Sequence, residues 1–527
     1  MGKLNHGPQF LRVLWLFFIF IMTVGLIVAT ILIVLEYLQY DTNINISIDK
    51  ESNDPFPALT ICHQHPFSNA AYQLWNQGDV LSPTQFSKII RKNAHERLSL
   101  PYRLVNLAEQ INQYDVISLY YQNLKEQQAE RIGFNTSIFL NCMYSMHSEV
   151  AFEDDCTKLE MFNVKRLSHH IYFNCHTFEP KNLDYSSGIS QLGLIVSLGP
   201  EPDYEKNEQA FLLDLFNTAK GLRVIVHPSG TFPNIEEDSV NVEPGKMNEI
   251  NFQHVQWENL DTPTHRCVKK NETIFEQDAE KIKTLKKLSK NLDYAYYELD
   301  QPYAYTEQQC DNYFQQKQII EKCNCQYVFF PRIEPIEKVP YCAQFLDKGK
   351  PEDVIKAEKC LQSIEPLEKS KLCKRQCTMS EYEWTTSVTK WRAVEWQLHW
   401  LRQLNKAFKQ MKNESTADMA YKKLTEFYEN DDLTKIPEQK SDNLNLKGDN
   451  FAYVVLKRKP GGKIIKKEKL TLSIYVLFSR IGGLCSLTIG LTTAFFIEII
   501  EFVYLIYYQR SRKTPEGQSH THKSAHI

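Results

Sequence analysis

The chain of 527 residues carries a formal net charge of -3 at pH 7, which argues against a general nucleic-acid binder, because such proteins carry a basic excess. Its length is sufficient for one large folded body or several smaller ones. Hydrophobicity is uneven, with two long apolar runs near opposite ends of an otherwise polar sequence.

The first apolar run, from Val13 to Leu35, contains no formally charged residue. At about 1.5 Å per residue, a helix of this length crosses a hydrocarbon core of about 30 Å. We therefore expect a transmembrane helix over 13–38, preceded by a short N-terminal segment over 1–12. A signal peptide is the alternative, but the run is longer than an h-region and no small-x-small cleavage site follows it.

The segment from 39 to 470 has strand and helix patterns that are far apart in the sequence. Four short stretches are rich in β-branched and aromatic residues, namely 56–62, 192–198, 222–227 and 451–456. Residues at three- and four-residue intervals predict helices between them, over 280–292 and 398–411. The combination predicts an α+β fold in which helices are inserted between the strands of a sheet.

A second apolar run begins near Leu472 and is interrupted by three charges, Arg480, Glu498 and Glu501. We expect one transmembrane helix over 471–508. Because intramembrane charges usually face a polar pathway rather than lipid, this helix is expected to line a pore. One face of it carries small side chains, which permit close approach of another helix. These residues are Gly482, Ser486, Gly490 and Ala494.

The flanking charges and the cysteines predict the topology. Basic residues precede the first run and follow the second, in the tail over 509–527, so the positive-inside rule makes both termini cytosolic and places 39–470 outside the cell. The N-glycosylation sequons all lie in this outer segment, at Asn45, Asn135, Asn271 and Asn413. Twelve of the 13 cysteines lie there as well, which predicts six disulfides in an oxidising compartment. We therefore expect a two-span glycoprotein of the plasma membrane.

Several motifs occur in a fixed order along the chain. They are His6-Gly7 before the first span, FPALTIC at 56–62, Cys175 to Phe178, and the strand-like segments 221–227 and 242–245. Together with the spacing of the later cysteines, they resemble the degenerin and epithelial sodium channel family, which includes acid-sensing and peptide-gated sodium channels. The resemblance implies an extracellular palm sheet with finger, thumb and knuckle helices, and links His6 and Gly7 to gating.

The same resemblance implies how the twelve outer cysteines pair. The implied disulfides are Cys62 with Cys175, Cys142 with Cys156, Cys267 with Cys377, Cys310 with Cys373, Cys323 with Cys360, and Cys325 with Cys342. Zinc binding by the Cys-x-Cys pairs is the alternative, which the oxidising compartment and the absence of paired CxxC motifs disfavour. We accordingly expect no metal site and no cofactor, with sodium as the permeant ion.

The resemblance also assigns residues of the pore. The family's Gly-x-Ser triplet, whose backbone oxygens form the narrow selectivity region, aligns with Gly490, Leu491 and Thr492. Glycine permits the chain to leave helical geometry and expose its carbonyl groups. Glu498 lies about two turns further along and would form a ring of three carboxylates, with Glu501 about one turn beyond it. Snorkelling of both glutamates to the membrane interface is the alternative.

Three further positions are implied to act in gating or in the outer pore. Ser479 aligns with the position where bulky substitutions hold degenerins open, and Arg480 with an acidic residue of the outer vestibule. Three arginines there would repel cations, so either Arg480 turns toward a neighbouring carboxylate or the subunit conducts best with partners that lack this arginine. Replacement of Arg480 by Asp is then expected to raise cation current. Tyr40 aligns with a tyrosine that, in acid-sensing relatives, pairs with an aromatic side chain shortly before the first thumb cysteine. This chain has Thr262-Pro-Thr264 at that position, ahead of Cys267, and so lacks the aromatic partner. Trp257, further away in the sequence, is the candidate to replace it.

These observations favour the pore-forming subunit of a trimeric, ligand- or stimulus-gated, sodium-preferring cation channel, assembled from identical or related subunits. The alternative is a non-conducting receptor or modulatory subunit on the same scaffold, active only in heteromers. Candidate extracellular ligands are a neuropeptide or protons, which His63, His65, His169 and His170 could sense. Membrane lipid is an expected partner and nucleic acid is not. We find no nucleophile and base arrangement typical of an enzyme.

Overall fold

The computed structural model describes residues 9–50, 54–86, 113–147, 149–153, 155–182, 186–198, 220–268, 294–298, 301–344, 351–364, 373–391, 451–489 and 493–512. The chain divides into two compact units. One unit contains Met1–Asn45 and Glu468–Ile527, together with the short loop Thr262–His265. The other contains Ile46–Asp261 and Arg266–Lys467.

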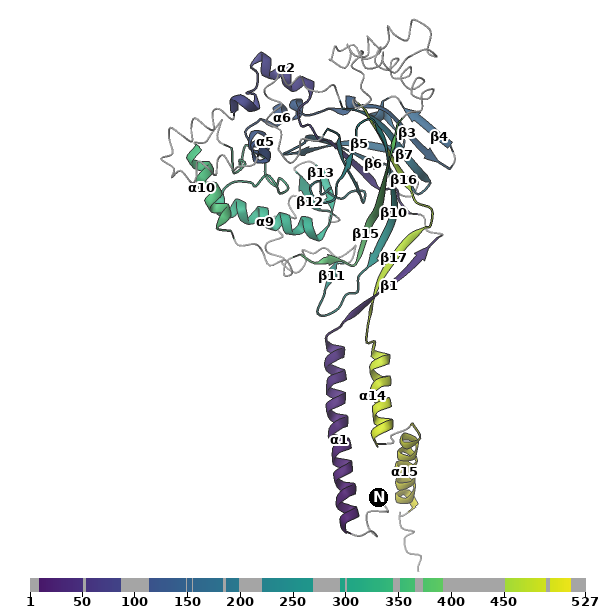
Figure 1. Ribbon diagram of the computed structural model, residues 1–527. Helices are drawn as coiled ribbons and strands as arrows, with labels where there is room; N and C mark the ends of the chain where they lie inside the picture. Colours follow the sequence, from purple (N-terminus) through teal and green to yellow (C-terminus); the bar gives the residue numbers. More distant parts are fainter. Residues whose placement is uncertain are drawn as a thin grey trace, which may run out of the picture. The chain divides into compact units, whose positions relative to one another are not determined.

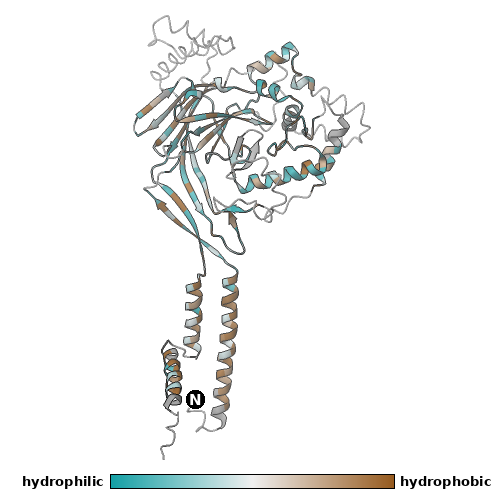
Figure 2. Ribbon diagram, turned by 180° about the vertical axis from the view of Figure 1, so that it is seen from behind, coloured by the Kyte–Doolittle hydropathy of each residue, from teal (hydrophilic) through white to brown (hydrophobic). Residues whose placement is uncertain are grey.

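The first unit is built on α1 (Gln9–Leu38), a helix composed mainly of Leu, Ile, Val and Phe. Within the described residues, Leu16–Leu38 is the one stretch long and apolar enough to cross a membrane. Figure 2 shows this helix coloured as hydrophobic along most of its length. Its large side chains, such as Phe17 at 63% exposure, face outward in the single chain, which suits a lipid environment rather than water. The apolar N-terminal helix expected from the sequence is therefore present.

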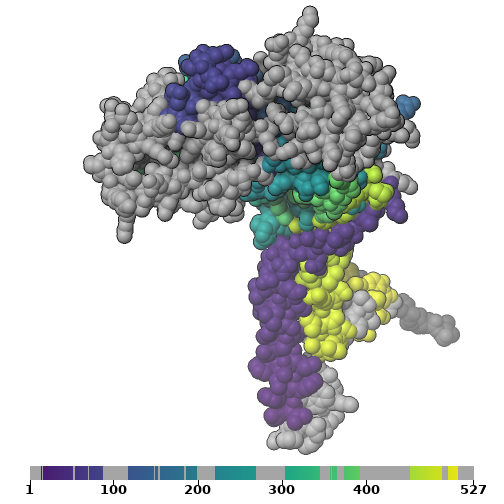
Figure 3. Space-filling model, turned by 45° about the horizontal axis from the view of Figure 1, so that its top comes forward, coloured from purple at the N-terminus to yellow at the C-terminus, as the bar shows by residue number. Residues whose placement is uncertain are grey.

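The second apolar run contains two described helical segments, and the single helix expected over 471–508 stays a prediction. The two segments are α14 (Ile474–Ile489) and α15 (Thr493–Arg512), and residues 490–492 between them lie outside the described part of the chain. α14 packs along α1, as the neighbouring ribbons in Figure 1 and the adjoining purple and yellow surfaces in Figure 3 show. α14 is apolar but short.

The main sheet has the strand order β1-β17-β10-β16-β7-β3-β4, with β15 paired to β10. Its strands are β1 (Thr42–Asp49), β3 (Phe139–Met146), β4 (Glu149–Glu153), β7 (Ile189–Ser197), β10 (Lys246–Glu258), β15 (Thr378–Lys390), β16 (Phe451–Arg458) and β17 (Lys463–Leu470). β10 pairs antiparallel with the whole of β15, and parallel with first β16 and then β17. Alternate residues of β10 are buried, including Ile250 and Phe252, as expected for a strand with one face on the core.

A second sheet has the order β5-β6-β2-β8-β9 and shares one hydrophobic core with the main sheet. Its strands are β2 (Ala58–His63), β5 (Phe162–His169), β6 (Phe173–Pro180), β8 (Leu222–His227) and β9 (Val240–Val242). β2 is the central strand, and all 6 of its residues are buried. Just before it, Phe56 meets Phe252 of β10 edge-on, with ring centroids 5.1 Å apart. The expected strands at 56–62, 192–198, 222–227 and 451–456 overlap β2, β7, β8 and β16.

Helices and short strands complete the unit that contains the disulfides, Ile46–Asp261 and Arg266–Lys467. α2 (Asn69–Gln77), α5 (Gln113–Gln122) and α6 (Glu126–Ile132) enclose an aromatic core that includes Trp75, Tyr120 and Phe173. The other elements are η2 (Thr136–Ile138), η3 (Cys156–Lys158), β11 (Cys267–Val268), β12 (Tyr294–Glu298), β13 (Gln301–Ala304), α9 (Glu307–Cys323), α10 (Pro351–Gln362) and β14 (Arg375–Gln376). The helices expected over 280–292 and 398–411 lie outside the described residues.

Disulfides join the twelve outer cysteines in the pairs that the family resemblance implies. They are Cys62–Cys175, Cys142–Cys156, Cys267–Cys377, Cys310–Cys373, Cys323–Cys360 and Cys325–Cys342. Cys62 and Cys175 are directly opposite each other on β2 and β6. The Cys323–Cys360 bond links the end of α9 to α10. The bonds close loops whose ends lie between 14 and 113 residues apart in the sequence, which reduces the entropy of the unfolded chain.

Several histidines of the unit that contains the disulfides are buried and neutral. Burial lowers the pKa of His63 to about 3, and it lowers the pKa of His65 and of His227 to about 4. The ring of His63 stacks on Phe134 with centroids 3.9 Å apart and contacts the carbonyl oxygen of Leu198 at 3.2 Å. These side chains do not change charge near neutral pH, so His63 and His65 do not suit the proton-sensing role considered from the sequence.

We predict that these buried histidines make the protein sensitive to acid. Above a pH of about 6.5 each is neutral in both the folded and unfolded states, whereas at lower pH only the unfolded state is protonated. Stability should therefore fall between about pH 6.5 and the lowered pKa, by up to about 1.4 kcal/mol per pH unit for each histidine. Thermal unfolding of the detergent-purified protein at several pH values measures this slope.

Two variants separate the histidines from the carboxylates, which also affect acid stability. His63→Gln should reduce the slope, because it removes one proton-binding site of the unfolded state. His265→Gln is the matched control, since His265 is exposed, and it should leave the slope unchanged. An identical slope for wild type and His63→Gln would show that the burial of His63 does not control its protonation.

Candidate functional site

α1 and α14 carry opposite charges where they pack together. Nη1 of Arg480 in α14 lies 3.2 Å from Oε1 and 3.3 Å from Oε2 of Glu36 in α1. Glu36 lies in the last turn of α1, and Arg480 in the second turn of α14. Arg480 is therefore turned toward a neighbouring carboxylate, which is one of the two possibilities that the sequence leaves open.

The ion pair determines the electrostatics of this region. Arg480 alone would present a full positive charge, whereas the pair as a whole is neutral. Both side chains are 46% exposed in the single chain, so in water the pair would stabilise the helix contact only slightly. In a membrane an unpaired charge costs several kcal/mol, and pairing reduces that cost. The charge of Arg480 is thus satisfied within one subunit.

The face of α14 that carries small residues is open in the single chain. Ser479, Gly482 and Ser486 are all exposed. A methyl group placed on Gly482 would meet no atom within 4 Å. Because α1 does not occupy this face, it is free to approach another helix closely.

The residues assigned to the constriction and to the inner end of the pore are only partly described. His6, Gly7, Gly490, Leu491 and Thr492 lie outside the described residues. α14 ends at Ile489, directly before the triplet, and α15 begins at Thr493, directly after it. Glu498 and Glu501 are both exposed on α15. Their spacing of three residues places them on the same side of the helix, about one turn apart.

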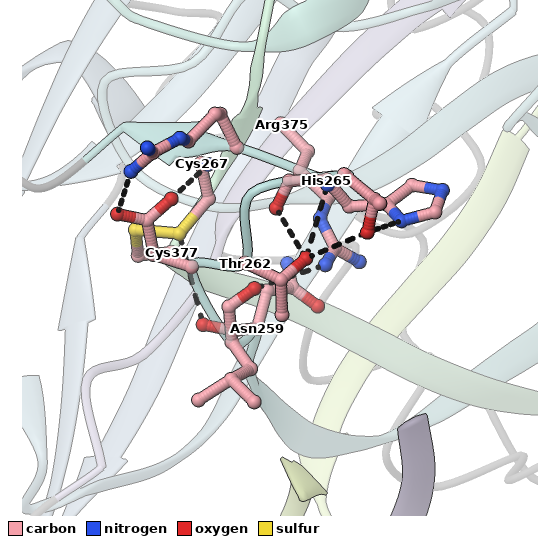
Figure 4. A network of polar contacts seen from close by, with 10 residues as sticks. Asn259, Thr262, His265, Cys267, Arg375 and Cys377 are labelled. Atoms are coloured by element: carbon pink, nitrogen blue, oxygen red, sulfur yellow. Dashed lines mark hydrogen bonds and ion pairs between the residues drawn. A yellow bond between two sulfur atoms is a disulfide. The ribbon is translucent and has the colours of Figure 1, made fainter. Parts of the chain in front are cut away.

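The resemblance implies a coupling contact between thumb and pore that involves Tyr40 and the segment before Cys267, and the structure describes both. Tyr40 follows α1 in a left-handed conformation with a φ of 54°, and its ring lies 5.7 Å from the ring of Tyr37. The loop Thr262–His265 groups with the membrane helices rather than with the strands that flank it in the sequence. In this loop the amide of Thr262 donates to the carbonyl of His265 at 3.2 Å, and the amide of His265 donates to Oγ1 of Thr262 at 3.0 Å (Figure 4).

A network of polar contacts and one disulfide holds the chain on either side of this loop (Figure 4). The amide of Asn259 donates to the carbonyl of Cys377 at 2.7 Å, and Cys377 forms a disulfide with Cys267. Nη2 of Arg375 donates to the carbonyl of Leu260 at 3.2 Å. The end of β10 and the start of β15 are therefore joined by covalent and polar contacts.

Trp257 connects three strands of the main sheet. Its indole Nε1 donates to Oε2 of Glu381 in β15 at 2.8 Å, and Nζ of Lys466 in β17 lies 4.9 Å from the centre of its ring. Lys466 also pairs with Glu383 at 2.7 Å. A cation over an indole ring is attracted by the electron-rich face. Trp257 of β10 is thus tied to β17, the strand that leads into α14.

Glu36 and Lys466 are the residues of this region that we did not select from the sequence. Glu36 follows the first apolar run directly, and Arg480 is the single cation near the start of the second. Since charges within membrane helices usually pair with each other, a lone acid and a lone base at the outer ends of two spans could have indicated the contact. No comparable signal marks Lys466, because it is one of several lysines in β17.

The predicted glycosylation sites are exposed where they are described. Asn45 lies in β1, and Asn135 precedes η2, where its side chain accepts a hydrogen bond from the amide of Ser137. Asn271 and Asn413 lie outside the described residues.

Comparison with known proteins identifies the relatives of the chain. The sequence profile of the amiloride-sensitive sodium channel family matches residues 1–502. Alpha subunits of epithelial sodium channels are similar, with 24% identity over 238 residues for Mus musculus, 23% over 293 for Gallus gallus and 23% over 443 for Xenopus laevis. These alignments cover 44%, 55% and 70% of this chain, and 29%, 40% and 63% of the respective relatives.

The chain spans less than two thirds of the length of each of these relatives. The identities are low, but the family profile extends over most of the chain, from the first residue through α1 and the extracellular sheets into α15. The chain therefore belongs to the amiloride-sensitive sodium channel family, whose members are ion channels.

Proposed function

We propose that this chain is the pore-forming subunit of a trimeric, stimulus-gated, sodium-preferring cation channel of the plasma membrane. The ion pair between Glu36 and Arg480 carries the proposal. Without it, three arginines would face the outer end of the pore and repel cations. With it, each subunit contributes a neutral ion pair at the outer end of the pore, so Arg480 no longer argues against cation conduction.

In this proposal α14 and α15 together form the second membrane span. The 16 residues of α14 extend only about 24 Å, which is short of a hydrocarbon core of about 30 Å. Continuation through residues 490–492 into α15 carries the chain across. The Gly490-Leu491-Thr492 triplet would then supply the carbonyl oxygens of the constriction, which can replace water around a sodium ion.

Glu498 would act at the cytosolic side of the constriction. Its side chain is exposed on α15 in the single chain, about one and a half turns beyond Thr492. In a trimer three such carboxylates form a ring that concentrates cations at the inner end of the pore. Glu501 lies one turn further along and extends the same negative region.

Assembly from three subunits, identical or related, agrees with the open face of α14. Ser479, Gly482 and Ser486 leave room for helices of neighbouring subunits, while the Glu36–Arg480 pair is completed within each chain. The relatives are named as subunits of a channel. Two spans place both termini in the cytosol and leave the disulfides and sequons outside the cell.

A signal from the extracellular unit has two routes to the pore in this proposal. β17 continues into α14 after three residues, and its Lys466 holds Trp257 of β10. The loop Thr262–His265 groups with the membrane helices. A peptide ligand suits this arrangement, and protons would act through groups other than the buried His63 and His65.

We predict that Ser479→Trp produces a constitutive sodium current. A bulky side chain on the open face of α14 should prevent the helices around the pore from closing, whereas the matched variant Ser479→Ala should behave like wild type. Whole-cell recording in sodium, potassium and calcium solutions measures conduction and selectivity. If none of these proteins conducts, alone or with epithelial sodium channel subunits, although biotinylation shows them at the surface, the chain is a non-conducting receptor or modulatory subunit.

The ion pair predicts that charge reversal at one position is harmful and reversal at both is tolerated. Arg480→Glu places two carboxylates together, and Glu36→Arg places two guanidinium groups together, so each should lower current and surface expression. The double variant restores an opposite-charge pair and should recover most of the loss. We expect a coupling of about 1 kcal/mol, a roughly fivefold effect, measured as current and biotinylated protein in the Ser479→Trp background.

The same contact changes the expectation for Arg480→Asp. This variant leaves Glu36 beside a second carboxylate, so a gain in current should appear only when Glu36 is also replaced by Gln. Purely additive effects of the single charge reversals would contradict the contact between these two side chains.

Glu498→Gln tests the proposed inner ring. Loss of three negative charges should lower inward sodium current several-fold and reduce its block by internal divalent cations. Glu501→Gln is the matched comparison and should have a smaller effect, because Glu501 lies further from the constriction. Equal effects of the two variants would argue for a general surface charge rather than a ring at Glu498.

A further inference from the structure

Three potential metal ligands meet where two connections between strands of the second sheet come together. His169 ends β5 and His170 begins the turn to β6, while Glu236 lies in the loop between β8 and β9. One ligand atom from each residue lies within 4.8 Å of the others. Because 66 or more residues separate the histidines from Glu236 in the sequence, sequence spacing alone does not indicate this cluster.

The ring of His170 is a buried donor aimed at the carboxylate. Only 6% of this side chain is exposed, and its Nε2 has no hydrogen-bond partner among the described residues. Nε2 lies 3.6 Å from Oε1 of Glu236, which is longer than a hydrogen bond. A buried nitrogen without a partner is costly, and a bound cation between it and the carboxylate would remove that cost.

The backbone of the turn fixes the ring of His169. Its Nδ1 accepts hydrogen bonds from the amides of Ile171 at 3.2 Å and Tyr172 at 3.4 Å. The neutral ring therefore carries its proton on Nε2 in this structure, and coordination through Nε2 would move that proton to Nδ1 and replace these two long hydrogen bonds with the metal bond. The rings of His169 and His170 are stacked with centroids 4.5 Å apart, and Phe329 packs on His170 at 4.4 Å.

The surroundings favour neutral imidazoles, which are the form that binds metals. Burial lowers the pKa of His169 to about 3, and it lowers the pKa of His170 well below its ordinary value. Burial and the neighbouring Glu237 raise the pKa of Glu236, although Arg223 opposes that effect. Both carboxylates would attract a cation to this point and offset Arg223, while the nearby Arg332 is paired with Glu126.

The cluster opens into a pocket with space for further ligands. The pocket has a volume of about 100 Å³, enough for a metal ion with bound water. Gln309 also lines it, and the Oε1 of this buried side chain has no partner in the part of the chain that the structure describes. In a tetrahedral zinc site the ligand atoms lie about 2.0 to 2.2 Å from the metal and about 3.3 Å from one another. The ligand atoms of this cluster are within 4.8 Å of one another, so small side-chain rotations would bring them to zinc-binding distance.

We propose that His169, His170 and Glu236 form a site for a divalent transition metal, with zinc the best match. Two imidazoles and one carboxylate are a ligand set typical of zinc, with a fourth position for water. Magnesium and calcium are disfavoured because they prefer oxygen ligands. The bound ion would join the turn between β5 and β6 to the loop between β8 and β9.

The experiment uses the full-length protein in detergent after removal of metals with EDTA. Three histidines of the C-terminal tail, His520, His522 and His526, could also bind zinc, so all proteins carry Gln at these positions. Titration with zinc against a chromogenic chelator at pH 7.4 should show one site per chain that magnesium does not compete for. Zinc should also raise the thermal unfolding midpoint.

Variants assign the site. His169→Gln, His170→Gln and Glu236→Gln should each weaken zinc binding by at least about 10-fold. Glu236→Gln is the variant least able to disturb folding, since its side chain is 42% exposed. His147→Gln removes an exposed histidine elsewhere and should leave the affinity unchanged.

Cobalt gives a readout that does not depend on variants. Cobalt(II) bound by two histidines and a carboxylate in tetrahedral geometry should produce visible absorption bands. The full-length protein with an intact site should show these bands, and added zinc should remove them by displacing the cobalt. Absence of both the bands and a zinc site would overturn the proposal. So would zinc affinity that is equal in wild type and in Glu236→Gln, because the ion would then be bound elsewhere.

Discussion

The extracellular unit depends on the pairing of β10. This 13-residue strand is matched along its whole length by β15 on one side, and by β16 and then β17 on the other. Parallel pairing with strands so far along the chain requires a long excursion between them. The Cys267–Cys377 bond closes much of that excursion, since Cys267 follows the end of β10 by nine residues and Cys377 directly precedes β15.

The same strand organises the charges of the unit. Phe252 of β10 lies beneath the guanidinium group of Arg458, and His254 two residues further along contacts Asp54 at 3.0 Å. Lys463 lies 3.7 Å from the same carboxylate. Buried charges are tolerated only with partners, and the carboxylate of Asp54 has partners on β10 and on β17. The segment before β2 is thereby held to β10 and to the start of β17, the strand that leads to α14.

Local patterns were sufficient to predict the strands but not their partners. The β-branched stretches at 56–62, 192–198, 222–227 and 451–456 identify four strands, because burial on one or both faces selects such residues. Their neighbours in the sheets depend on contacts between distant segments, which periodicity does not report. For the same reason the Glu36–Arg480 pair was left as one of two possibilities, the contact of Lys466 with Trp257 was not foreseen, and His169 and His170 were considered without Glu236. The cysteine pairs came from the family resemblance and not from spacing.

The disulfides have a practical consequence for the remaining cysteine. Twelve of the 13 cysteines are bonded in pairs, which leaves Cys485 of α14 as the only free thiol. It is partly exposed and lies between Gly482 and Ser486, on the helix that faces neighbouring subunits in the proposed assembly. A thiol-directed spin label or fluorophore would therefore mark one known position per chain without any substitution. Distances between such labels would report how far the helices of an assembled complex separate.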